Sequence, residues 1–112
     1  MININKVTLI GNLGEDPVRG QAANGDFCSV SLATNESYKD KNGEWQTITE
    51  WHKLKVWGKQ AEWFYNQFKK GDVAYIDGKI KYGSYDKADG TRIYTTDIVV
   101  KEFKKVNNDP KL

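Results

Sequence analysis

The 112-residue chain has the length of one domain, and its 38% apolar and 29% charged residues are ordinary for a soluble globular protein. It contains no signal peptide, no transit peptide and no apolar run that could span a bilayer, so we expect a cytoplasmic protein with no membrane partner. The net charge of +2 argues only weakly for a polyanionic partner, and the single cysteine excludes an internal disulfide and a multi-cysteine zinc site.

The first part of the chain predicts two strands separated by a turn-rich segment. Residues 5–13 alternate loosely between apolar and polar side chains and predict a strand. Residues 15–26 contain Pro, Gly and an Asn-Gly pair and predict a loop or hairpin. A second strand is expected at residues 27–38, where Cys28 is interpreted as a small buried hydrophobe rather than a reactive thiol. The Asn-Gly pair within residues 39–44 then predicts a hairpin turn.

Residues 47–58 carry the most informative pattern in the chain and predict a third strand, because they are rich in β-branched and aromatic residues without a helical period. Alternate side chains of a strand point to opposite faces. One face then looks like core in its later half and carries Ile48, Glu50, His52, Leu54 and Val56. The other face combines two indoles and two ammonium groups and carries Thr47, Thr49, Trp51, Lys53, Lys55 and Trp57.

Neither a packed core nor plain water suits this second face. Unpaired lysines are costly to bury, and two tryptophans are poorly placed in water unless something covers them. At about 3.3 Å per residue, the two indoles lie roughly 20 Å apart, a span of several nucleotides. A flexible polyanion with flat rings, such as single-stranded nucleic acid, satisfies both demands. The open alternative is that the indoles pack against a neighbouring subunit while the lysines stay solvated.

Residues 59–70 change to a helical period, with apolar side chains on one face. We expect Lys69 and Lys70 to occupy the last turn and Gly71 to cap the helix. Trp63 in this helix is interpreted as a packing residue rather than a binding residue.

Two further strands are predicted after the helix. Residues 72–85 return to a period of two, with an inward face expected to hold Ala74, Ile76, Ile80 and Tyr82. The other face repeats the basic and aromatic pattern with Lys79, Lys81 and Tyr85, and we expect Tyr38 to join this aromatic and basic face. A polar loop at residues 86–92 leads to the last strand at residues 93–103, and we expect the polar end from residue 104 to fray.

Five short strands with one helix between the third and fourth predict an all-β fold, a small closed barrel of the OB type. We expect one OB-fold domain over residues 1–106, followed by a short disordered tail at residues 107–112.

No residue pattern predicts catalysis, a metal site or a cofactor. His52, the only histidine, lies near Glu50, but no serine or cysteine is positioned as a nucleophile, so a hydrolase is the weakest alternative. The sequence GNLGED at residues 11–16 has two glycines but lacks the Lys-Ser/Thr that a phosphate-binding loop needs. The acidic residues are scattered and show no metal-ligand spacing.

At these residues the chain resembles the bacterial single-stranded DNA-binding proteins. The segments NKVTLIGNLGEDP, SLATNES, TEWHKLKVWGK, KKGDVAYIDGKI and YTTDIVV match the strands of that family in order, so the likeness extends over about residues 5–106. It implies an OB-fold homotetramer that coats single-stranded DNA without sequence preference in replication, recombination and repair, near the nucleoid. It also implies stacking by Tyr38, Trp51, Trp57 and Tyr85, and places His52 at a subunit interface.

Two departures from the family pattern stand out. The spacing between Asp16 and Cys28 is tighter than usual. The family's Gly/Pro/Gln-rich linker and acidic tip do not follow residue 106, so we expect no tail-mediated recruitment of other proteins. A primosome-type OB-fold accessory protein, a related dimer that binds DNA and docks replication partners, remains the alternative.

Overall fold

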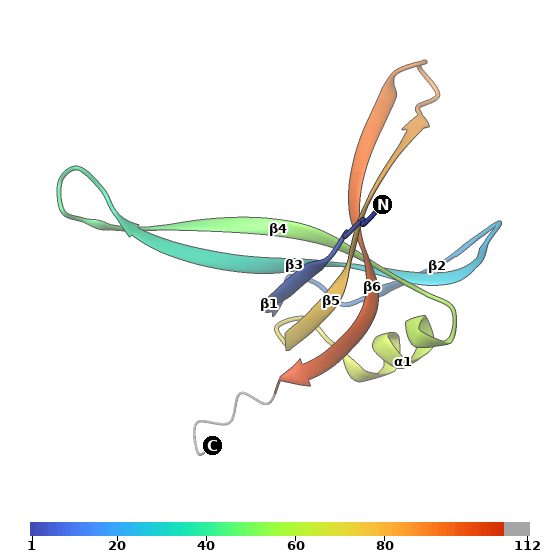
Figure 1. Cartoon of the computed structure of the whole chain (residues 1–112), viewed down its shortest axis with the longest axis horizontal. Helices are drawn as coiled ribbons and strands as arrows, with labels where there is room; N and C mark the ends of the chain where they lie inside the picture. Colours follow the sequence, from blue (N-terminus) through green and yellow to red (C-terminus); the bar gives the residue numbers. More distant parts are fainter. Residues whose placement is uncertain (107–112) are drawn as a thin grey trace.

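A computed structural model describes residues 1–106 and shows one curved sheet with a single helix packed at one end (Figure 1). The elements in chain order are β1 (Val7–Leu13), β2 (Val18–Ala22), β3 (Gly25–Lys39), β4 (Trp45–Trp57), α1 (Lys59–Gln67), β5 (Val73–Asp86) and β6 (Arg92–Val106). The predicted tail at residues 107–112 lies outside the described residues. No helix in the described part of the chain is long and apolar enough to cross a membrane.

Five of the strands close into a ring. The sheet order is β1-β5-β6-β4-β3-β2, and β1 also pairs with β3 at its end, which joins the two sides. β4 and β6 run parallel where they pair, at Leu54 with Ile98, and the other pairings are antiparallel. With the helix between the third and fourth strands of the ring, this arrangement confirms the predicted OB-type fold class.

β2 is a sixth strand, and with β3 it forms a hairpin at residues 15–26, where the sequence predicts a loop or hairpin. It pairs with β3 alone, from Val18 opposite Ser29 to Ala22 opposite Gly25. Most of its side chains are exposed, so its sequence, VRGQA, has no need to alternate between apolar and polar residues and does not show the pattern of a half-buried strand. Pairing with β3 therefore determines its conformation, and the local sequence does not.

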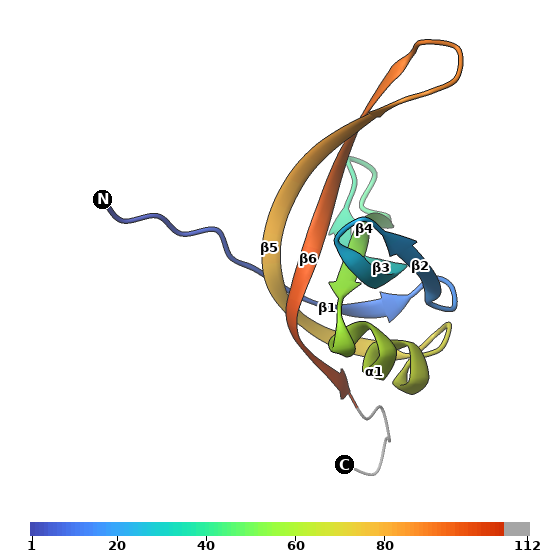
Figure 2. The ribbon, with the colours of Figure 1, turned by 90° about the vertical axis from the view of Figure 1, so that its right-hand side faces the viewer.

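Figure 2 shows α1 beside the ring of strands, and the core is made of buried side chains from both. Phe64 from the helix and Phe68 just after it are fully buried, with ring centroids 4.3 Å apart. They meet Phe103 of β6 edge to face. The strands contribute Leu13, Cys28, Val30, Leu32, Leu54, Val56, Ala74, Ile76, Ile98 and Val100. Leu54 and Val56 are thus buried as the alternation of residues 47–58 predicts, and so is Cys28.

The helix ends at Gln67, three residues before the predicted end. Phe68 adopts an extended conformation that keeps its ring in the core beside Phe64, and this ends the helical path. Gly71 does not cap the helix; it lies in the following turn with φ of +90°, and its amide donates to the carbonyl of Leu13. The expected basic last turn is therefore absent from α1.

The predicted end of the last strand was also wrong. β6 continues to Val106, and its final residues pair with the start of β5 instead of fraying. Lys105 contributes an ion pair of 3.3 Å with Asp72. The Asp72 carboxylate accepts a hydrogen bond from the Lys69 amide, which with Lys105 lowers the pKa of Asp72 below its usual value.

Two hairpins project beyond the ring as long arms (Figures 1 and 2). The β3–β4 arm comprises residues 35–50 and the β5–β6 arm comprises residues 81–96. Nearly all side chains of the first arm are exposed, on both faces. Tyr82, predicted to face inward, lies on the second arm and is 74% exposed, because the row it shares with Ile76 has already left the core.

Candidate nucleic-acid interface

The outer row of β4 contains the Trp-Lys-Lys-Trp pattern. The register with β3 places Ala33 beside Trp51, Ser31 beside Lys53, Ser29 beside Lys55 and Phe27 beside Trp57. Cross-strand partners lie on the same face of a sheet. Three of these four partners are small, so the lysines and Trp51 stand above their β3 neighbours. The outer row is therefore open to a ligand along most of its length.

Trp51 is 60% exposed and rests on the backbone of Gly14. A Cβ atom at position 14 would overlap the six-membered ring of the indole. Glycine is thus required at this position if the ring is to keep its place. The segment GNLGED therefore supports the indole through its second glycine.

Trp57 forms an aromatic pair with Phe27 at the other end of the row. Their ring centroids are 5.1 Å apart and their planes are inclined by 49°. The Lys55 ammonium lies 4.5 Å from the Phe27 centroid and 5.5 Å from the Trp57 centroid. Both contacts fall within the cation–π range, so the rings hold a positive charge at the surface of the sheet.

A groove of about 550 Å³ lies between β3–β4 and the β5–β6 arm. The predicted site residues that line it are Lys53, Lys55 and Tyr85. Phe27, Ser29, Ser31, Glu15 and Asp97 are among its other lining residues. A smaller adjoining pocket brings together Lys55, Trp57 and Lys81. The groove therefore collects side chains from four strands, including both lysine-bearing strands that the sequence singled out.

Lys79 also belongs to this outer face. It pairs with Val99 of β6, which in turn pairs with Lys55 of β4. The three residues thus lie side by side across the ring, with Lys79 exposed at the far strand. Lysines from both strands can follow a phosphate backbone laid across this face.

Tyr38 is the one predicted stacking residue that the structure places elsewhere. It pairs with Gln46, whereas Ser37 and Asn35 share the row of Trp51. Tyr38 therefore lies on the opposite row of the β3–β4 arm, where it is 45% exposed. It is not brought into the groove within one chain.

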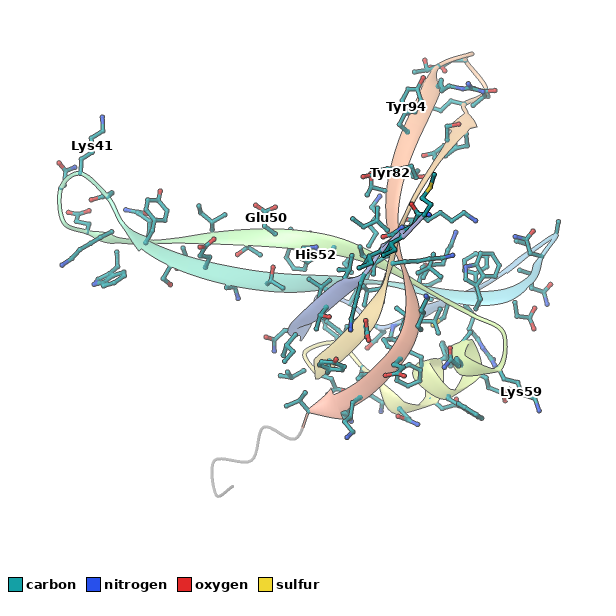
Figure 3. All side chains as sticks on the ribbon, in the orientation of Figure 1. Lys41, Glu50, His52, Lys59, Tyr82 and Tyr94 are labelled. Atoms are coloured by element: carbon teal, nitrogen blue, oxygen red, sulfur yellow. The ribbon has the colours of Figure 1, made fainter. Side chains whose placement is uncertain are left out.

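His52 lies on the inner row, opposite Leu32, and is half-buried. Its Nε2 and the Thr34 hydroxyl are 2.9 Å apart and share a hydrogen bond. A cavity of about 260 Å³ places His52 near Trp51, Lys53 and Tyr94, and Figure 3 shows His52 on β4 and Tyr94 on the β5–β6 arm. Among residues 1–106, no group of three or more His, Cys, Asp or Glu side chains could hold a metal ion.

The sequence reasoning missed Phe27 and Gly14 at this face, and also Tyr94, which lies on the opposite row of β6 with Ile98. Phe27 was assigned only to the start of a strand, although alternation puts it on the row opposite Cys28, outside the core. Tyr94, 77% exposed, gave no signal because its position depends on where the β5–β6 arm leaves the ring. The role of Gly14 depends on a contact with Trp51, 37 residues away in the chain.

Cys28 has no part in this face. Burial raises the pKa of its thiol to about 11, against a smaller opposing effect of Arg19. A thiol that stays protonated and buried is not a nucleophile at neutral pH. This agrees with its interpretation as a packing residue.

Comparisons with known proteins agree with this geometry. Residues 4–106 match the single-strand binding protein family. The "Single-stranded DNA-binding protein 1" of Chlorobaculum tepidum is 41% identical over 103 residues, which is 90% of this chain and 64% of that protein. The "Single-stranded DNA-binding protein" of Xylella fastidiosa is also 41% identical, over 90% of this chain and 62% of its own length. The chain thus spans less than two thirds of the curated relatives it matches.

Solved structures show the same fold. The Plasmodium falciparum SSB complex with ssDNA superposes with a TM-score of 0.81 and 24% identity, over 96% of this chain and 98% of that chain. A deletion mutant of the single-stranded DNA binding protein from Thermus aquaticus gives a TM-score of 0.78 at 20% identity, over 95% of this chain and 52% of that one. The family match and the 41% identities lead to one conclusion: the chain belongs to the single-strand binding protein family.

Proposed function

We propose that this protein binds and protects single-stranded DNA, without catalysis and without sequence preference, in DNA replication, recombination and repair. The observation that carries the proposal is the outer row of β4, where exposed or half-exposed indoles at Trp51 and Trp57 flank Lys53 and Lys55. The names of its relatives and the family match support the same activity.

The chemistry of the row favours single strands over duplex. Aromatic rings stack on free bases, which a duplex does not offer because its bases are already stacked. Lysines contact phosphates and read no base edge, so this mode of binding is independent of sequence. A soluble DNA-coating protein of this kind works in the cytoplasm, at the nucleoid.

The test is a titration of tryptophan fluorescence with oligo(dT) and with a duplex of equal length at equal salt. We expect strong quenching and tight binding with oligo(dT), and far weaker binding with duplex. Equal affinity for the two ligands would contradict the proposal.

Assembly into a homotetramer is part of the proposal. Ile2, Ile4 and Ile10 are 91%, 84% and 58% exposed, which suits burial against a second copy better than contact with water. Within the described residues, β1 pairs with β3 only at Asn12 and Leu13, so most of its outer edge can accept another strand.

His52 provides a test of the assembly. Its partly buried ring is bonded to Thr34 and lies on the row opposite Trp51, so a subunit interface can use it without touching the stacking row. We expect His52→Lys to shift the protein toward smaller species at micromolar concentration, since it adds a charge there. Solution mass across a dilution series measures this. A wild-type dimer would favour the primosome-type alternative, and an unchanged mutant mass would remove His52 from the interface.

A further inference from the structure

Phe27 lies between two separate hollows of the surface. It lines the groove between the ring part of β3–β4 and the β5–β6 arm, and it also lines a cleft of about 640 Å³ between the β2–β3 hairpin and the start of α1. The remaining lining of the cleft is Arg19, Gly20, Gln21, Asp26, Gly58, Lys59, Ala61 and Glu62. Figure 1 shows β2 and α1 together, away from the β3–β4 arm, and Figure 3 marks Lys59 at the start of the helix.

The Phe27 ring is held in a fixed position. Gly20 is its cross-strand partner on β2, and the distal edge of the ring lies where a Cβ of residue 20 would be. The tilted contact with Trp57 and the ammonium of Lys55 complete its surroundings. The ring is half-buried, lies at the surface and stays outside the core cluster. This is the setting of a stacking platform, since a rigid ring loses little freedom when a base covers it.

The cleft beyond Phe27 is balanced in charge. Arg19 and Lys59 contribute two cations, Asp26 and Glu62 two carboxylates, and Gln21 an amide. The Arg19 guanidinium lies 4.7 Å from the centroid of Tyr65. Equal numbers of charges do not concentrate phosphate, but donors and acceptors together suit the polar edges of a nucleobase.

We propose that Phe27 is a further base-stacking residue, and that the DNA strand runs from the groove beside the β5–β6 arm, across Phe27, into the hairpin–helix cleft. The inference rests on the proposed binding of single-stranded DNA. One base stacks on Phe27 beside the Trp57 ring, and the next base enters the cleft. The strand then occupies a longer path than the outer row of β4 alone provides.

The test measures the affinity of fluorescently labelled oligo(dT) of graded length by anisotropy. Phe27→Leu keeps an apolar side chain over Gly20 but removes the ring. We expect it to bind the shortest oligonucleotides like the wild type and to lose about 5- to 150-fold in affinity for longer ones, the loss of one stacked base. Its salt dependence should be unchanged, because no charge is removed.

Gln21→Glu tests the cleft itself with an isosteric change that adds one negative charge. We expect a severalfold loss for long oligonucleotides at low salt and none for short ones. Gln67→Glu, the same exposed substitution at the other end of α1, is the matched control and should bind like the wild type.

Wild-type affinity at every length in both Phe27→Leu and Gln21→Glu would overturn the extended path and leave the proposed function intact. Failure of the wild type to bind oligo(dT) of any length would instead overturn the proposed function.

Discussion

The five-stranded ring and the two arms are built from the same strands but obey different rules. In the ring, one row of each strand is buried and contributes to the core, as Leu54 and Val56 do on β4. Ten residues earlier on the same strand, in the β3–β4 arm, both rows are exposed, and Trp45 is 70% exposed. The ring therefore holds the core, and the arms leave their side chains exposed.

The proposed binding face lies where these two regions meet. Trp51, Lys53 and Lys55 stand on strands anchored by buried neighbours on the opposite row. The rings of Trp51 and Phe27 are further supported by Gly14 and Gly20. Rigid support of this kind lets the side chains stack on bases without a large loss of conformational entropy on binding.

The largest expected effect is a difference in unfolding free energy between a variant in the ring and a variant in the β3–β4 arm. Phe64→Ala removes a fully buried ring from the core and should cost about 3–5 kcal/mol of unfolding free energy. Trp45→Ala, on the β3–β4 arm, should change it by about 0.5 kcal/mol or less. Denaturant unfolding of the two variants measures the difference. A comparable loss in Trp45→Ala would show that the arm takes part in the folded core.

A smaller effect concerns binding alone. Trp51→Ala should weaken oligo(dT) binding by about 1–3 kcal/mol, the general range for base stacking on single-strand-binding OB folds. Its unfolding free energy should stay near that of the wild type, since the indole is 60% exposed. Trp63→Ala, which removes a 55% exposed indole from α1, is the matched control. If both variants bind like the wild type, the outer row does not stack.

Gly14→Ala should reduce oligo(dT) affinity by less than Trp51→Ala does. The added methyl group displaces the indole of Trp51, but the ring is still present and can still contact a base. The double variant Gly14→Ala/Trp51→Ala should bind no worse than Trp51→Ala, because the methyl group then has no ring to move. Additive losses in this cycle would mean that Gly14 acts on binding through another route.

The smallest effect is electrostatic. Lys55→Gln should lower the slope of log affinity against log salt by about 0.7, the value for one phosphate contact on a single strand. Base preference should stay the same. Lys70→Gln, beyond the end of α1, should leave the slope unchanged. An unaltered slope in Lys55→Gln would show that the wild-type Lys55 ammonium contacts no phosphate and interacts only with the rings of Phe27 and Trp57.

Much of the ring could be predicted from the sequence, because burial imposes a period on the residues that form it. The alternation in residues 47–58 gave the buried and outer rows of β4 correctly. The same rule failed for Tyr82, since periodicity reports which row a residue occupies and says nothing of where that row leaves the core. A loop or hairpin was expected at residues 15–26, but β2 was not given as a separate strand, because its pairing with β3 determines its bounds.

The sequence predicts which side chains share a face within one strand, but it does not predict how the strands of the candidate site align with one another. Lys53, Lys55 and Tyr85 meet in one groove, yet Tyr38 lies on the opposite row from Trp51. Its placement depends on the β3–β4 register, which a hairpin turn signal does not specify to the residue. The aromatic and basic pattern and the family resemblance both gave Tyr38 as a stacking residue, and within one chain that role remains a prediction.

The central claim is that single-stranded DNA binds along the outer row of β4, and that its bases stack on the indoles of this row more strongly than on aromatic rings elsewhere on the surface. The most direct measurement labels all four tryptophans with 5-fluorotryptophan and follows their ¹⁹F resonances during titration with oligo(dT). We predict that the resonances of Trp51 and Trp57 shift the most and that Trp63 on α1 changes least. A titration in which Trp63 shifts while Trp51 and Trp57 stay in place would contradict the account.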